Sequence, residues 1–174
     1  MGASSTAPQP WPTPSGRRRR PDERSGRNIS GPLLRQPLLV VGLDGSTAAW
    51  RAAAYALGQA RRQGAGLAFV YVNTPLPWWA AGFAPQLIPS LRDAETQAEA
   101  NITRQLAAVL SEESVPWALL YRRGCPVTQL ARAADALCAD AVVVGASRRR
   151  PRRVTPSVAG RLLRSRHWLV TVVP

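Results

Sequence analysis

The sequence predicts an α/β fold, an open five-stranded parallel sheet with helices on both faces. Two observations carry this prediction. From residue 38 to the C-terminus, short apolar runs alternate with longer segments of helical periodicity, a pattern typical of parallel strands joined by right-handed helical crossovers. The first run, residues 38–43, is continuously apolar, which suits a strand buried on both faces of the sheet.

The first strand is expected to end in a tight turn that leads into a helix. The turn is Asp44-Gly45-Ser46, and Ser46 is a favourable N-cap. Apolar residues at helical spacing follow over 50–57. The glycine-containing segment 64–66 then ends the helix before a second apolar run, residues 67–72, which we interpret as the second strand.

The rest of the chain continues the alternation. Residues 73–90 form a long irregular segment containing Trp78 and Trp79, and a loop of this length is usually a functional lid or an interface element. We expect Trp50 and Trp117 to lie in the core. The further predicted elements are a helix at 91–110, a strand at 117–121, a helix at 126–138, a strand at 141–145, a short helix at 157–164 and a last strand at 168–173.

The first 36 residues differ in composition from the rest. They contain four prolines at alternate positions from Pro8 to Pro14 and an arginine run at 17–20. Such a segment cannot bury enough apolar surface to offset its ordering entropy. We therefore expect a disordered tail over 1–36 and one folded domain over 37–174. A solvated extension is the favoured interpretation of the tail; an arm attracted to nucleic acid or acidic partners is the alternative.

Composition argues against several classes of protein. No apolar run approaches the roughly eighteen residues of a membrane helix, and the N-terminus lacks the order of a secretory signal. Two cysteines, Cys125 and Cys138, are too few for a disulfide framework or a zinc site. We expect reduced thiols, a cytoplasmic location and no membrane partner.

The excess positive charge lies in two places. The net charge is +5 over residues 1–36, zero over 37–147 and +8 over 148–174. Charge alone would attract nucleic acid, with a steep salt dependence. Nucleic acid is nevertheless the least favoured partner, because neither basic stretch is interleaved with aromatic residues before Trp168.

Two loops are the expected ligand site. In open α/β sheets, ligands lie beyond the carboxyl ends of the strands, where the strand order reverses. The loops at that position are 44–46, after the first strand, and 145–157, after the fourth.

Four motifs in these regions resemble the universal stress protein family. Residues 40–46 (Val-Val-Gly-Leu-Asp-Gly-Ser) resemble its opening strand and turn, and Gly124-Cys125-Pro126 resembles its Gly-x-Pro turn. Residues 139–145 are similar to its fourth strand, and Ser157-Val158 to the start of its last helix. The resemblance covers residues 38–174 and implies a Rossmann-like, adenine nucleotide alpha hydrolase-like fold.

The resemblance also implies a function. It implies a non-catalytic, ATP-responsive regulator of the stress response, with at most slow ATP hydrolysis, and a homodimer formed through the last strand, Trp168 to Val173. The alternative is a dimeric interaction module that binds no nucleotide and whose basic surface binds a protein or anionic partner.

The loop after the fourth strand departs from the family's ATP-binding pattern of Gly-x-x-Gly, nine residues and Gly-Ser/Thr. Gly145 is retained, but Arg148 replaces the second glycine, Pro156 replaces the last, and the spacer has seven residues. Arg148 and Arg149 are candidates to grip phosphate in place of the lost glycines. The predicted nucleotide-binding residues are Asp44, Gly45, Ser46, Val72, Gly124, Pro126, Gly145, Arg148, Arg149, Ser157 and Val158, with Mg²⁺ as an accompanying ion.

No catalytic or metal-ligating residues are predicted. His167, the only histidine, lies away from the ligand loops. Ser46 and Ser157 have no neighbouring base in the sequence, without which serine is a poor nucleophile. Cys125 follows Arg122 and Arg123, which are expected to lower its pKa. A redox role would follow from that, but the favoured interpretation of Cys125 is a small residue that fills a turn. The acids at 93, 95 and 99 are interpreted as a solvated helix face.

Overall fold

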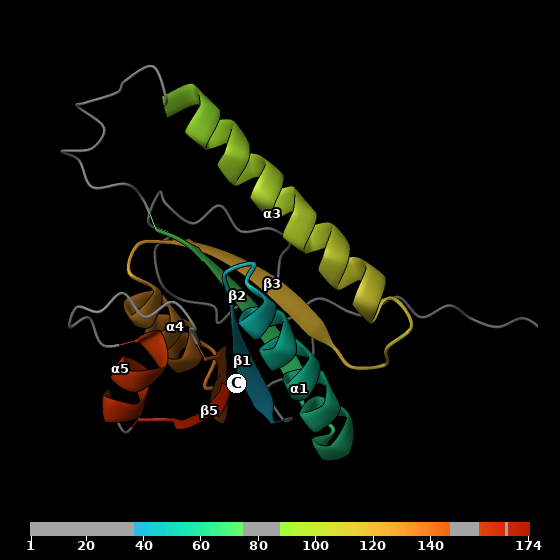
Figure 1. The fold of residues 1–174 in the computed structure, drawn as a ribbon. Coiled ribbons are helices and arrows are strands. Elements are labelled where there is room, and N and C mark those ends of the chain that lie inside the picture. Colours follow the sequence, from blue (N-terminus) through green and yellow to red (C-terminus); the bar gives the residue numbers. More distant parts are fainter. Residues whose placement is uncertain (1–36, 75–87, 147–156, 166) are drawn as a thin grey trace, which may run out of the picture.

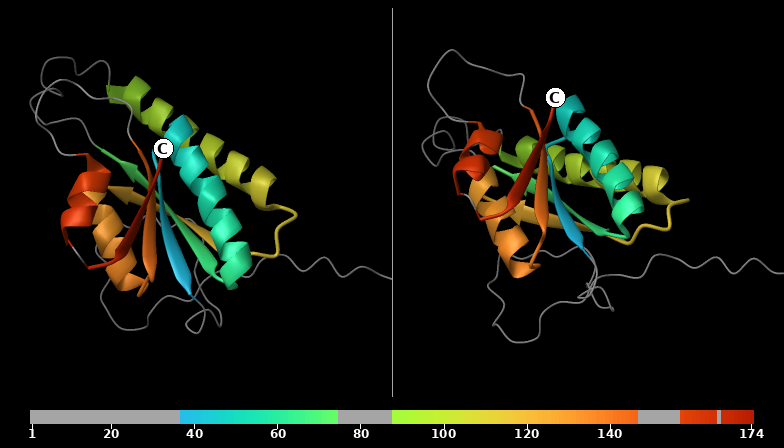
Figure 2. Two further views of the ribbon diagram at one scale, coloured as in Figure 1. Left: turned by 60° about the horizontal axis from the view of Figure 1, so that its bottom comes forward. Right: turned by 90° about the horizontal axis from the view of Figure 1, so that it is seen from below.

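The computed structural model describes residues 37–74, 88–146, 157–165 and 167–174, and confirms the predicted fold class. Five parallel strands lie in the order β3-β2-β1-β4-β5. Helices α1 and α3 cover one face of the sheet, and α4 and α5 cover the other (Figures 1 and 2). The elements are β1 Leu38–Leu43, α1 Thr47–Gln63, β2 Gly66–Asn73, α3 Ile88–Leu110, β3 Trp117–Arg123, α4 Pro126–Ala136, β4 Ala141–Gly145, α5 Val158–Ser165 and β5 Leu169–Val173.

Strand β1 is the centre of the sheet. It pairs with β2, where Val41 lies opposite Phe69, and with β4, where Val41 lies opposite Val143. Successive residues point to opposite faces, so Leu39 and Val41 enter the core under α1 and α3, whereas Leu38 and Val40 enter the core under α4 and α5. The run 38–43 is therefore apolar because β1 is buried on both faces of the sheet, as predicted.

Alanines bring α1 close to the sheet. Its buried positions are Ala49, Ala52, Ala53, Ala56, Leu57 and Ala60. As predicted, Ser46 is the N-cap, and its Oγ accepts a hydrogen bond from the backbone N–H of Ala49 at 3.2 Å. The helix ends at Gly64, which adopts the left-handed conformation with φ 61° and so provides the usual glycine C-cap.

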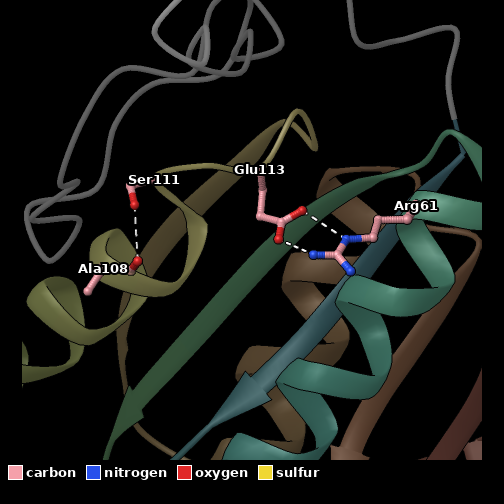
Figure 3. A network of polar contacts seen from close by, with 4 residues as sticks. All are labelled: Arg61, Ala108, Ser111 and Glu113. Atoms are coloured by element: carbon pink, nitrogen blue, oxygen red, sulfur yellow. Dashed lines mark hydrogen bonds and ion pairs between the residues drawn. The ribbon is translucent and has the colours of Figure 1, made fainter.

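An ion pair fastens the far end of α1 to the chain that follows α3. The Arg61 guanidinium binds both carboxylate oxygens of Glu113, with the bond from Nε to Oε2 at 2.8 Å (Figure 3). The hydroxyl of Ser111 donates to the Ala108 carbonyl at 3.1 Å and closes the last turn of α3. These contacts lie at the amino edge of the sheet, away from the predicted ligand loops.

Several predictions of detail are corrected. Helix α3 begins at Ile88 rather than 91, because Pro89 is compatible with a first helical turn. Strand β3 continues to Arg123, since β2 continues to Asn73 and the two strands remain paired. Trp50 and Trp117 are only partly buried and pack against the core cluster rather than lying within it.

Other predictions fall outside the described residues. The tail 1–36, Trp78, Trp79, Arg148 and Arg149 are among them. Within the described parts of the chain, no helix is long and apolar enough to cross a membrane.

Candidate functional site

The strand order reverses between β1 and β4. From β1 the chain passes through α1 to β2 on one side, whereas β4 leads to β5 on the other. Helix α1, which follows β1, and helix α5, which comes after β4 in the chain, lie on opposite faces of the sheet (Figure 2). The reversal between β1 and β4 is the position at which open α/β sheets bind ligands. The predicted turn 44–46 lies there, as do Gly145 and Ser157 at the two ends of the predicted loop 145–157, whereas residues 147–156 lie outside the described residues.

Asp44 stands at this point as an exposed carboxylate. Its Oδ1 accepts a hydrogen bond from the backbone N–H of Ser46 at 2.9 Å, which fixes the side chain within the turn. Gly45 has φ 78°, and a methyl group built on it would meet no atom of the described residues within 4 Å. A carboxylate has acceptor capacity on both oxygens, so Asp44 is able to accept a hydrogen bond from a ligand's hydroxyl or amino group.

Gly145 is required by packing at the end of β4. A Cβ at this position would lie 2.4 Å from the carbonyl carbon of Ala48 and 2.5 Å from its oxygen. The first turn of α1 thus rests directly on the Gly145 backbone, and no side chain fits between them. This glycine has a structural reason to be present whether or not a ligand binds.

Gly124 is required by backbone conformation at the end of β3. Its φ is 122°, a region that L-residues rarely adopt. Two hydrogen bonds hold the turn. The Gly124 N–H donates to the Asn73 carbonyl at 2.9 Å, and the side-chain amide of Gln129 donates to the Arg123 carbonyl at 2.9 Å. The hydroxyl of Thr74 lies 3.4 Å from the Gly124 carbonyl.

The remaining predicted residues also lie at the carboxyl edge. Ser157 accepts the Gly160 N–H on its Oγ at 3.1 Å and so caps α5, and Val158 packs against the core under α4 and α5. Val72 lies half-buried near the end of β2, and Pro126 opens α4. The topology therefore gathers every described candidate at one edge of the sheet.

Cys125 has a lowered pKa, for a different reason from the one predicted. Hydrogen bonding with Thr128, first through its backbone and then through its side chain, lowers the pKa of the exposed thiol, and Arg161 of α5 contributes through its charge. Arg122 and Arg123 are not among the causes. Cys125 occupies the N-cap position of α4, where its side chain makes no capping hydrogen bond; a helix N-terminus is a place at which the pKa of a cysteine is commonly lowered.

Sequence reasoning missed Tyr71, which immediately precedes Val72 on β2. Burial raises the pKa of its phenol, and the carboxylates of Glu99, Glu95 and Asp44 raise it further. Its ring meets Tyr121 edge to face with centroids 6.0 Å apart. The only signal in the sequence was its place at a strand end beside a candidate residue.

The described residues offer no ready metal centre. No group of three or more His, Cys, Asp or Glu side chains is placed to hold a metal ion in the parts of the chain that the structure describes. His167 is exposed and lies against Trp168, with ring centroids 5.5 Å apart. The carboxylate of Glu95 is committed to the Arg123 guanidinium at 2.7 Å, so Glu95 is only in part the solvated residue that was expected.

An open parallel sheet with a polar loop at its switch point defines a protein of the Rossmann-like α/β class. The sequence profile of the Universal stress protein family matches residues 38–174. The chain belongs to this family.

Solved structures of universal stress proteins have a similar fold. A protein from the universal stress protein family of Burkholderia pseudomallei is 28% identical, covers 80% of this chain and 96% of its own, and gives a TM-score of 0.63. The universal stress protein UspA from Lactobacillus plantarum is 22% identical, with coverages of 80% and 99% and a TM-score of 0.67. A universal stress protein in complex with cAMP is 24% identical, with coverages of 80% and 97% and a TM-score of 0.54. No match is found among curated proteins.

Proposed function

We propose that this chain is a cytoplasmic, non-catalytic regulator of the stress response that binds an adenine nucleotide, ATP in the first instance, at the carboxyl edge of its sheet. The observation that carries the proposal is the exposed Asp44 carboxylate, fixed by the Ser46 N–H at the switch point between β1 and β4. The cAMP found in a solved relative supports adenine nucleotides as the ligand class.

The adenosine end of the ligand fits this edge. Asp44 would accept a hydrogen bond from a ribose hydroxyl or the adenine amino group. Among the described residues, no atom lies within 4 Å of a Cβ built on Gly45, which favours room for a sugar or base beside Asp44. Val72 and the Gly124 turn would border the ligand on the side of β2 and β3. The family resemblance also assigns the adenosine end to the first loop, which agrees with this placement.

The phosphate end would rely on positive charge from α5 and the chain before it. Arg161 is exposed in the first turns of α5 and is one candidate to bind the phosphates. Arg148 and Arg149 are proposed to bind them as well. Arginine binds phosphate through two parallel hydrogen bonds. A Mg²⁺ ion would be bound mainly by the phosphates, because the described residues contain no cluster of three or more His, Cys, Asp or Glu side chains that could hold it alone.

The hydroxyls of Ser46 and Ser157 support a binding role without catalysis. Each accepts a backbone N–H as a helix cap, at 3.2 and 3.1 Å. A hydroxyl used in this way holds a helix terminus, and a nucleophile would need a base to remove its proton.

A homodimer through β5 is the second part of the proposal. This strand is an edge of the sheet and carries no charged residue, and the side chains of Leu169 and Val172 are 71% and 36% exposed. An apolar edge with unpaired backbone groups favours pairing with a second copy about a two-fold axis. Sedimentation at micromolar concentration should show a dimer, and Leu169→Arg should dissociate it; a wild-type monomer contradicts this part.

A module that binds no nucleotide is the competing function. The packing of Gly145 and the cap formed by Ser157 favour it, because both residues of the motif have structural reasons to be present. In that case the β5 edge and the basic C-terminal region would serve a protein or anionic partner.

Nucleotide content and affinity distinguish the two functions. The freshly purified protein would be denatured and any released nucleotide identified, and ATP and cAMP would then be titrated by calorimetry. Asp44→Asn should weaken binding at least about tenfold through loss of one charge-assisted hydrogen bond. Asp135→Asn is the matched control, because this exposed carboxylate lies at the C-terminal end of α4, away from the carboxyl edge of the sheet at which α4 begins. No released nucleotide and no heat at millimolar ATP would refute the nucleotide-binding proposal.

A further inference from the structure

The inward stripe of α3 changes chemistry halfway along the helix. Positions separated by three or four residues share one face of a helix, and such a stripe runs through residues 95, 99, 102, 106 and 110. Ile102, Leu106 and Leu110 are buried in the core under this face of the sheet. At the two preceding positions, toward the N-terminus, the stripe carries half-buried glutamates instead.

The described part of the N-terminal half makes an ion pair and a hydrogen bond with β3. The Arg123 guanidinium binds the Glu95 carboxylate at 2.7 Å, with side-chain exposures of 62% and 32%. The Tyr121 hydroxyl donates to the Glu99 carbonyl at 2.9 Å and also contacts the hydroxyl of Thr103. Exposed ion pairs stabilise far less than buried leucines do, so this half of α3 is the more weakly held.

The same strand end carries the candidate ligand turn. Arg123, which binds Glu95, directly precedes Gly124. The Arg123 carbonyl is held by Gln129 and the Gly124 N–H by Asn73, both at 2.9 Å. A ligand that fixes the Gly124 turn therefore also fixes the backbone from which the Arg123 side chain reaches α3.

A second connection runs through two tyrosines. Tyr121, which contacts α3, packs edge to face on Tyr71. Burial, and then Glu99, Glu95 and Asp44, raise the pKa of the Tyr71 phenol. Asp44, which is proposed to bind the nucleotide, and the two glutamates of α3 therefore influence the same phenol, that of Tyr71.

We propose that the N-terminal half of α3, residues 93–101, docks on and leaves β3 as a unit, and that the Arg123–Glu95 ion pair couples this docking to the ligand at the Gly124 turn. The coupling rests on the proposed function. Binding favours the docked state, and by reciprocity docking strengthens binding by the same factor. Undocking uncovers Tyr121 and Tyr71, which gives a regulator a surface that depends on its ligand.

Hydrogen exchange tests the docking without any nucleotide. In the wild type, amides at 93–101 should exchange faster than those at 102–110. Arg123→Gln and Glu95→Gln should each accelerate exchange at 93–101 only, and the charge-swapped pair Arg123→Glu with Glu95→Arg should restore it. Arg61→Gln is the matched control, because it breaks the ion pair beyond the opposite end of α3. Uniform exchange along α3, or no response to either variant, overturns the docking proposal.

Calorimetry and exchange with ATP test the coupling. ATP should slow exchange at 93–101 in the wild type, and Arg123→Gln and Glu95→Gln should each weaken ATP binding about two- to fivefold. Arg61→Gln should change neither. If Asp44→Asn abolishes ATP binding but both α3 variants bind like the wild type, the coupling is wrong and the site stands. If the wild type binds no ATP, the proposed function and the coupling both fall, and exchange without nucleotide still decides the docking.

Discussion

Gly145 and Gly124 stand at the carboxyl ends of two strands of one sheet, yet they are glycines for different reasons. At the end of β4, the constraint is space, because a Cβ would lie 2.4 Å from the Ala48 backbone. At the end of β3, the constraint is conformation, since φ of Gly124 is 122°. The nearest atom to a Cβ there is the side-chain amide nitrogen of Gln129 at 3.2 Å, at the end of a flexible side chain.

These two causes change what a glycine of the nucleotide-binding pattern indicates. On the β1/β4 side the edge is closely packed, and its glycine belongs to the core. On the β2/β3 side the edge is polar and is held by hydrogen bonds and an ion pair. A glycine that matches a nucleotide-binding pattern is therefore not by itself a sign of nucleotide, and the exposed Asp44 carries more of the functional argument.

The largest expected effect is at the packed side. Gly145→Ala forces a methyl group into the backbone of α1, which has to move away from the sheet, and should lower the free energy of unfolding by about 3 kcal/mol. Urea unfolding measures the loss. Gly58→Ala, within α1 and with only the flexible Arg62 side chain near its Cβ, is the control and should stabilise by about 0.5–1 kcal/mol. Equal stability of Gly145→Ala and wild type would contradict the packing argument.

The polar side should respond less strongly. Gly124→Ala places an L-residue in a conformation that only glycine tolerates well, at a cost of about 2 kcal/mol. If conformation is the cause, removing the Gln129 side chain in a double variant should not relieve the loss. If the double variant Gly124→Ala with Gln129→Ala recovers the stability of the wild type, then space constrains Gly124 at the end of β3 as it constrains Gly145 at the end of β4.

Helix capping provides the smallest contrast. Helices α1 and α5 begin with serine caps on the packed side, whereas α4 begins at Cys125, and a thiol is a weaker acceptor than a hydroxyl. Ser46→Ala should cost about 1 kcal/mol of unfolding free energy, and Cys125→Ser should gain about 0.5 kcal/mol. Urea titrations of both variants decide this, and equal or lower stability of Cys125→Ser would contradict the expectation that a serine hydroxyl caps α4 better than the thiol does.

The order of elements and the place of the site could be predicted because their causes are local. Apolar runs, the Ser46 cap and the glycine break at 64–66 act over a few residues, and parallel topology then puts the loops at one edge. The family motifs predicted membership of the universal stress protein family, and the sequence match over 38–174 confirms that membership.

What could not be predicted depends on contacts between distant residues. The bond between Arg61 and Glu113 spans 52 residues, and the one between Arg123 and Glu95 spans 28. The close approach of Ala48 to Gly145 exists only once the sheet is assembled. The extra length of β3 followed from its partner β2, and the pKa of Cys125 followed from Thr128 across the first turn of α4 rather than from the adjacent arginines.

The pairing of β1 with β4 has a consequence for how the chain is made. The Leu38 N–H donates to the Asp140 carboxylate at 2.7 Å and the Asp140 N–H donates to the Leu38 carbonyl at 2.9 Å, across 102 residues. While a ribosome is still translating the chain before β4, β1 is an unpaired apolar edge on that side. Such edges attract other chains, so the nascent protein keeps an aggregation-prone edge until its fourth strand emerges.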